Sequence, residues 1–160
     1  MASKITYNLK LRDLIQTKNL TPETKSKIKQ ELGELLYDLV LKDTSNQRSA
    51  VTGQRWKGLN PKSRYYKEKS KVAPGIANLE LTGAMLDALE YKPTAQGIEI
   101  GIYGVEQALK AENHLKTTAR SRRTNVPQRQ FLPKRGESFR PGILKELKEV
   151  AEDIINDELD

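Results

Sequence analysis

Apolar residues recur at helical spacing in two parts of the chain. The first part begins at Thr21-Pro22-Glu23, which supplies an N-cap oxygen, a proline at the first helical position and a negative charge at the positive end of the helix dipole. Apolar residues then repeat every three or four positions through about Lys42, which predicts a long amphipathic helix with one buried face. These residues are Ile28, Leu32, Leu35, Leu36, Leu39 and Val40.

The second helical pattern closes the chain after Pro141-Gly142 and predicts another amphipathic helix. Its apolar stripe consists of Ile143, Leu147, Val150, Ala151, Ile154 and Ile155. Its polar side carries Glu146, Glu149, Glu152, Asp153, Asp157 and Glu158. We interpret this acidic row as a solvated helix face and not as a set of paired catalytic carboxylates, because charge runs on helices usually face water.

Alternation of apolar and polar residues predicts strands in two other places. From Ile5 to Leu11 every second residue is apolar, which is typical of a half-buried strand, although residues 11–16 fit the start of a helical turn equally well. Residues 89–92, a turn over residues 94–97 and residues 98–103 read as an antiparallel hairpin. We expect its buried face to consist of Ile98, Ile100 and Ile102. Because Pro93 cannot donate a ladder hydrogen bond, its strand belongs at an edge or a bulge.

The remaining segments have weaker signals. A short helix is expected from Thr82 through Leu89, and two helical turns over residues 105–113. Residues 44–80 and 114–141 show no periodicity, and we expect them to form long extended basic loops. The whole pattern predicts an α+β fold in which a small antiparallel β-sheet is flanked by long amphipathic helices. We expect one domain over residues 1–160, with an N-terminal strand or arm over residues 1–20.

The composition excludes several kinds of site that depend on cysteine or on clustered histidine. The chain has 160 residues, no cysteine and one histidine, His114. A disulfide framework, a cysteine nucleophile and a Cys/His zinc site are therefore excluded. We expect neither a signal peptide nor a membrane span, and a protein made and used in a reducing cytoplasm. We also expect no cofactor.

The net charge of +7 is concentrated in two segments. Residues 48–71 contain 8 basic and 1 acidic residues, and residues 115–136 contain 7 basic residues and no acidic one. Each segment therefore carries +7, while the rest of the chain together carries −7. The charge marks two basic segments on a chain that is otherwise acidic.

The basic segments allow two interpretations. Clustered arginines suit phosphate contacts, and Tyr65 and Tyr66 among lysines suit stacking on bases, but the chain has no helix-turn-helix, zinc-finger or RNA-recognition signature. Alternatively, the segments meet an acidic protein surface, such as the last helix of a second copy. The residues proposed to contact a neighbouring subunit or a DNA channel are Lys116, Arg120, Arg122, Arg123, Arg129, Lys134 and Arg135.

Enzymatic signals are weak. Gly97, Gly101 and Gly104 match neither a dinucleotide-binding loop nor a phosphate-binding loop. Asp87 and Glu90-Tyr91-Lys92 contain half of a metal-dependent nuclease motif, but an acid-x-Lys triplet is frequent by chance in a highly charged chain. We expect no catalytic residues and no metal site, and a metal-dependent nuclease stays a distant alternative.

An ordered set of short motifs resembles the phage virion morphogenesis (tail completion) family. The motifs are Thr52-Gly53-x-x-Trp56-x-x-Leu59, Leu79-x-Leu81-Thr82-Gly83-x-x-Leu86, the hairpin, Ala111-x-x-His114, Val126-Pro127-x-Arg129-x-Phe131-Leu132-Pro133 and the closing helix. The similarity runs from about residue 20 to the end. Two features depart from the family: Leu-Lys-Thr after His114 replaces the usual glycine, and the loop before Val126 is unusually rich in arginine.

The resemblance implies a non-enzymatic structural protein of the phage neck, added where the tail joins the DNA-filled head. It implies a homohexameric ring around the DNA channel and contacts with adjacent neck, connector and tail proteins. DNA would pass through the ring without sequence-specific recognition, and no membrane would be involved. The location would be the virion, and the host cytoplasm during assembly. The motif anchors are Gly53, Trp56, Leu59, Thr82, Gly83, His114, Pro127, Phe131 and Leu132. As large apolar residues, Trp56 and Leu59 are also expected to anchor residues 43–80 onto the domain. Phe131 and Leu132, between two prolines, are expected to pin the second basic loop to the sheet.

Overall fold

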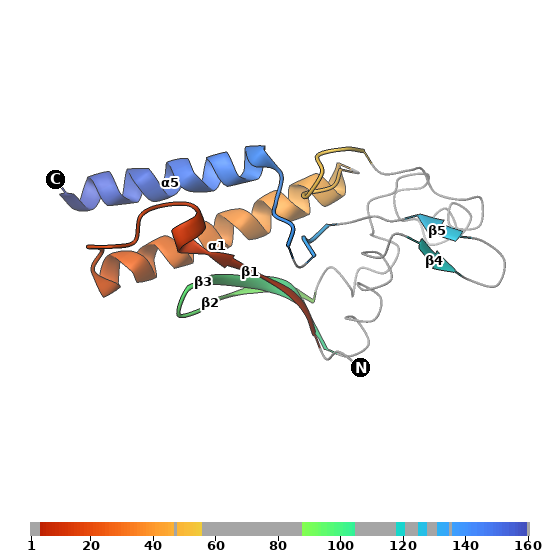
Figure 1. Cartoon of the computed structure of the whole chain (residues 1–160), viewed down its shortest axis with the longest axis horizontal. Coiled ribbons are helices and arrows are strands. Elements are labelled where there is room, and N and C mark those ends of the chain that lie inside the picture. The colour runs from red at the N-terminus through yellow and green to blue at the C-terminus, as the bar shows by residue number, and fades with distance from the viewer. Residues whose placement is uncertain are drawn as a thin grey trace.

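The fold of the chain, seen in a computed structural model, is α+β: a three-stranded antiparallel sheet packed with two helices (Figure 1). The structure describes residues 4–46, 48–55, 88–104, 118–120, 125–127, 131–134 and 136–159. The predicted fold class is confirmed. None of the helices in these ranges is long and apolar enough to cross a membrane.

Helix α1 (Pro22–Ser45) begins as its sequence predicts. The Thr21 side-chain oxygen accepts a hydrogen bond from the Thr24 backbone N–H at 3.1 Å, so the N-cap satisfies one of the free donors of the first turn. The predicted apolar face is buried, with Ile28, Leu32 and Leu36 fully inside the core. The helix continues past Lys42 because Asp43 and Thr44 are also buried.

Strands β1 (Lys4–Lys10), β2 (Leu89–Pro93) and β3 (Gly97–Tyr103) form the sheet in the order β1-β3-β2. The predicted hairpin is confirmed: Ile98, Ile100 and Ile102 are fully buried. Pro93 lies in edge strand β2, as its missing N–H requires.

Two predictions about element ends need adjustment. After β1 the chain makes a short 3-10 turn, η1 (Leu11–Asp13), so the strand and the turn expected around Leu11 both exist, one after the other. Leu89 pairs with Ile102 in β2, as the predicted hairpin requires, so it does not belong to the helix predicted from Thr82. The rest of that predicted helix, residues 82–87, lies outside the described residues.

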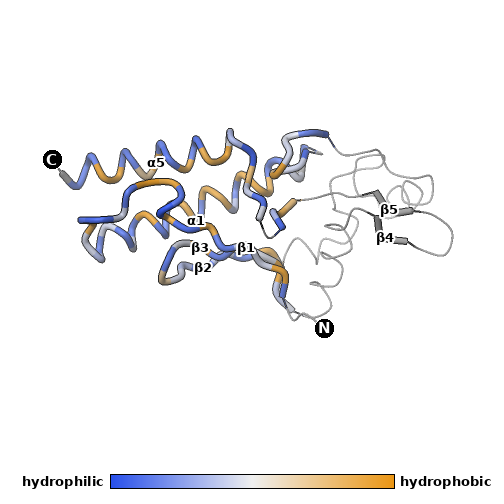
Figure 2. Tube along the Cα trace, in the orientation of Figure 1, coloured by the Kyte–Doolittle hydropathy of each residue, from blue (hydrophilic) through white to orange (hydrophobic). Residues whose placement is uncertain are grey.

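Helix α5 (Pro141–Leu159) lies along α1, and α1 lies between α5 and the sheet (Figure 1). The predicted apolar stripe is confirmed, since Ile143, Leu147 and Ala151 are fully buried. Figure 2 shows hydrophilic residues along the outer side of α5 and apolar residues on the side that faces α1. The acidic residues of its polar side are exposed, as expected of a solvated face.

The segment over residues 114–141 differs from the expected loop without regular structure. It contains strands β4 (Thr118–Arg120) and β5 (Asn125–Pro127), which pair antiparallel with each other. Strands of three residues are too short to show an alternating pattern, so no periodic signal predicts them. Farther along, Phe131, Leu132 and Phe139 join the core, and the Phe139 ring meets the Tyr7 ring edge-on with centroids 5.3 Å apart. Phe131 and Leu132 were predicted to pin this segment to the sheet, and both are buried in the core cluster that contains the isoleucines of β3.

Candidate interaction surfaces

Residues 48–55 form a compact loop after α1, which we call the root loop because it is the start of the first basic segment in the sequence. The Arg48 N–H donates to the Asp43 carbonyl at 2.9 Å, and the Ser49 N–H donates to the Gln54 carbonyl at 3.0 Å. The Ser49 hydroxyl oxygen accepts from the N–H groups of Val51 and Thr52, both at 3.1 Å. The loop therefore satisfies its own backbone groups and has a defined shape.

Gly53, one of the motif anchors, has a physical reason to be glycine. Its φ is +76°, a left-handed conformation that residues with a Cβ rarely adopt. Its N–H donates to the Ser49 carbonyl at 2.9 Å, which closes the turn of the root loop. The motif residue thus shapes the loop from which the basic segment begins.

An ion pair joins the end of α1 to Arg140, the residue before α5, and the backbone of Arg140 in turn binds the root loop. Arg140 donates from Nε to Asp43 Oδ2 at 2.8 Å and from Nη2 to Asp43 Oδ1 at 3.1 Å. The Asp43 side chain is only 5% exposed. The Arg140 backbone N–H also donates to the Ala50 carbonyl at 2.8 Å. The hydrogen bond from the guanidinium to Asp43 raises the pKa of Arg140, against the opposing effect of burial, so the Arg140 guanidinium keeps its positive charge.

The first and last residues of the root loop are arginines that lie opposite each other. Arg48 and Arg55 are partners in an antiparallel bridge. Because the next pair inward, Ser49 and Gln54, holds the hydrogen bond, the arginines form the non-hydrogen-bonded type of pair, in which side chains are closest. Both are exposed, and neither has an ion-pair partner among the described residues. The Cβ atoms of such a pair lie about 4.5–5.5 Å apart, and like charges directly opposite each other are destabilising.

The described ends of both basic segments lie at one end of the fold. The turn between β2 and β3 meets the first half of α1, where Lys29 Nζ donates to the Thr94 carbonyl at 2.6 Å. The open ends of β2 and β3 therefore point toward the other end of α1. The root loop, the start of α5 and residues 131–134 lie at that same end, opposite the C-terminus (Figure 1).

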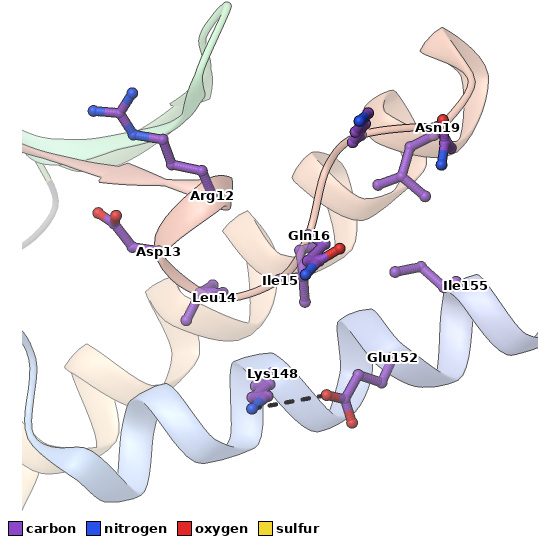
Figure 3. A pocket seen from close by; sticks show the side chains of 11 residues that line it. Arg12, Asp13, Leu14, Ile15, Gln16, Asn19, Lys148, Glu152 and Ile155 are labelled. Atoms are coloured by element: carbon purple, nitrogen blue, oxygen red, sulfur yellow. Dashed lines mark ion pairs between the residues drawn. The ribbon is translucent and has the colours of Figure 1, made fainter.

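Helix α5 has three distinct faces. One faces the core, and a second carries exposed Glu146, Glu149, Asp153 and Asp157, which are spaced by three or four residues and share one side. The third face lines a groove of about 600 Å³ against residues 12–20. Leu14, Ile15 and Ile155 give this groove apolar walls, and its rim includes Arg12, Asp13, Lys18 and the Lys148–Glu152 ion pair (Figure 3).

The outer face of the sheet carries polar side chains that contact one another. The Tyr103 hydroxyl donates to Glu99 Oε1 at 2.7 Å, and Lys4 Nζ donates to the same oxygen at 3.2 Å. Lys92 Nζ lies over the Tyr103 ring at 4.2 Å from its centroid, so the lysine of the acid-x-Lys triplet has a structural contact. Within the described residues no group of three or more histidine, cysteine, aspartate and glutamate side chains is placed to hold a metal ion.

The structure describes only part of the set of predicted site residues. Lys134 is exposed, and its backbone N–H donates to Glu137 Oε1 at 2.9 Å. Arg120 and Pro127 belong to the backbones of β4 and β5. The predicted residues outside the described ranges are Trp56, Leu59, Thr82, Gly83, His114, Lys116, Arg122, Arg123, Arg129 and Arg135, as are residues 105–113, for which helical turns were expected.

Sequence reasoning did not single out Arg48, Arg55, Asp43 or Arg140. Arg48 and Arg55 were counted only as charge, because their pairing depends on the turn closed by Ser49 and Gly53. Comparison of the chain with protein-family models, with curated proteins and with solved structures found no match. The family resemblance therefore rests on the order of the short motifs alone.

Proposed function

We propose that this chain is a non-enzymatic structural subunit of the head-to-tail junction of a tailed phage, where it assembles as a homohexameric ring around the DNA channel. Its partners would be its own copies and the adjacent neck, connector and tail proteins, in the virion after assembly in the host cytoplasm. The observation that carries the proposal is the ordered set of motifs, to which the fold adds a glycine turn at Gly53 and buried anchors at Phe131 and Leu132.

The charge distribution supports assembly from like subunits. A ring requires a heterologous interface, in which one patch of a subunit meets a different patch on the next subunit. The acidic face of α5 is exposed and lies on a well-formed helix, while two other segments of the same chain each carry a charge of +7. One chain therefore supplies both signs of charge, which supports a contact between the acidic face of one subunit and a basic segment of the next.

A second candidate function is binding of nucleic acid without sequence specificity by a free monomer. The unpaired Arg48 and Arg55 favour this candidate, because adjacent guanidinium groups suit phosphate oxygens. No observation among the described residues favours a metal-dependent nuclease over these two functions.

The proposal is tested by the mass of the purified protein in light scattering and by mass spectrometry of phage particles. We expect a mass of about six chains in solution, and the protein in particles at a few copies. The double substitution Glu149→Lys with Asp153→Lys should raise the protein concentration needed for ring formation at least tenfold, because it reverses the charge of the acidic face of α5. Glu31→Lys with Glu34→Lys is the matched control, since both glutamates are exposed on α1. A strict monomer that is absent from particles would overturn the proposal.

A further inference from the structure

Arg48 and Arg55 form a pair of cations held next to each other by the backbone. Their adjacency does not depend on side-chain rotamers, because the bridge and the flanking Ser49–Gln54 hydrogen bond of 3.0 Å fix the two Cα positions. The loop behind them is closed by the Ser49 hydroxyl and by Gly53. Because the backbone already places the two arginines next to each other, a ligand that bridges both side chains does not have to bring distant parts of the chain together.

The described residues offer no internal reason for placing these charges together. Neither arginine is paired with a carboxylate in the part of the chain that the structure describes, and the nearest acidic side chain in sequence, Asp43, is already held by Arg140 in two hydrogen bonds. An anion between the two guanidinium groups would convert their repulsion into attraction. Guanidinium groups present a planar fork of donors that fits phosphate oxygens in pairs.

The anion most consistent with this surface is a phosphodiester backbone. Residues 48–71 contain 8 basic residues against 1 acidic residue, so the two arginines begin a long run of positive charge. A nucleic-acid duplex presents a continuous row of phosphates to such a run, with one negative charge per about 1.7 Å of axis.

We propose that Arg48 and Arg55 form a phosphate-binding site for the backbone of double-stranded DNA, contacted without sequence reading. The choice of duplex DNA as the polyanion rests on the proposed function, in which the subunit surrounds a DNA channel. The Asp43–Arg140 pair acts as a positioning element for this site, because Arg140 holds the root loop through the Ala50 carbonyl.

The test measures binding of the full-length protein to a fluorescein-labelled 30-base-pair duplex of mixed sequence, by fluorescence anisotropy at several salt concentrations. We expect Arg48→Gln with Arg55→Gln to weaken binding about tenfold or more and to lower the slope of log affinity against log salt by about 1.8, the value for two lost phosphate contacts. Arg48→Lys with Arg55→Lys keeps both charges and should keep most of the slope, while losing part of the affinity with the guanidinium fork.

The matched control is Lys18→Gln with Lys25→Gln, which removes two positive charges near the opposite end of α1. It should leave affinity within about twofold, and thermal melts should show that all variants fold. The proposal is overturned if the wild type does not bind the duplex, if the control loses as much affinity as the arginine variant, or if the arginine variant changes self-association and not DNA binding. Loss of the protein from phage particles, in contrast, reports on the proposed function and not on this site.

Discussion

At the scale of single residues, Glu99 shows how the sheet holds a charge at low exposure. Its side chain is only 16% exposed, yet it accepts hydrogen bonds from the Tyr103 hydroxyl and from Lys4. The Tyr103 hydrogen bond, with a smaller effect from Lys4, holds the pKa of Glu99 below its usual range despite burial. Burial and the neighbouring Glu99 carboxylate raise the pKa of Tyr103, so the phenol keeps its proton and remains the donor.

This arrangement makes part of the stability depend on pH. Because the pKa of Glu99 is lower in the folded protein than in the unfolded chain, the ionised carboxylate stabilises the fold above the ordinary glutamate pKa of about 4.3. That contribution is lost as the pH falls through the lowered folded pKa. Tyr103→Phe removes the principal donor and should lower the free energy of unfolding by about 1 kcal/mol at pH 7. We expect the difference from wild type to shrink as the pH falls through the lowered pKa of Glu99.

Urea denaturation between pH 2 and pH 8 measures this difference. Tyr37→Phe is the control, because the Tyr37 hydroxyl has no hydrogen-bond partner among the described residues, and its difference from wild type should not change with pH. A Tyr103→Phe difference that is the same at pH 3 and pH 7 would contradict the role given to Glu99.

At the scale of elements, α1 docks on β2 through a glycine. An added Cβ at Gly33 would lie 2.7 Å from Cε2 of Tyr91, too close for two carbon atoms. The Tyr91 ring in turn packs against the Tyr37 ring at a centroid distance of 6.1 Å, and its hydroxyl accepts from Gln30 Nε2 at 3.4 Å. The helix thus carries glycine in its interior, where alanine is normally better by about 1 kcal/mol, so that an aromatic ring can lie on its surface.

A double-mutant cycle separates these two effects. Gly33→Ala should destabilise the protein by about 1–3 kcal/mol, because the new methyl group forces the Tyr91 ring out of its position. In a Tyr91→Leu background the same substitution should be neutral or stabilising by up to about 1 kcal/mol, because only the helix propensity remains. Thermal or urea unfolding of the four proteins measures the cycle. Equal effects of Gly33→Ala in both backgrounds would contradict the contact.

The elements that could be predicted from sequence are those whose signal is local. The cap at Thr21, the apolar stripe of α5 and the alternation through Ile98, Ile100 and Ile102 all act within a few residues, and all are confirmed. β4 and β5 escaped prediction because three residues are too few for a period. The Arg48–Arg55 pair escaped it for a different reason: its register depends on hydrogen bonds made within the folded root loop.

At the scale of the whole molecule, one ion pair joins parts of the chain that are distant in sequence. Asp43 and Arg140 are 97 residues apart, and their contact connects the end of α1 to the start of α5. With the Ala50 carbonyl bound by the Arg140 N–H, the described ends of both basic segments become parts of one connected structure. No local sequence pattern predicts such a contact, because each residue taken alone is typical of a charged residue on the surface.

Removing one partner of this pair should therefore have a large effect on global stability. Arg140→Met leaves the Asp43 carboxylate buried without its cation, and we expect the free energy of unfolding to fall by about 3–5 kcal/mol. Asp43→Met combined with Arg140→Met should recover most of this loss, because an apolar pair of similar size leaves no uncompensated charge. Lys145→Met, which removes an exposed charge from the same helix, should change stability by less than about 0.5 kcal/mol.

Hydrogen exchange shows where in the molecule the stability is lost. In Arg140→Met, protection should fall first at the N–H groups of residues 48–55 and last in β3, since the root loop depends directly on the ion pair and the central strand does not. Equal loss of protection in both places, or a stability change under about 1 kcal/mol, would show that the pair does not hold this end of the molecule together.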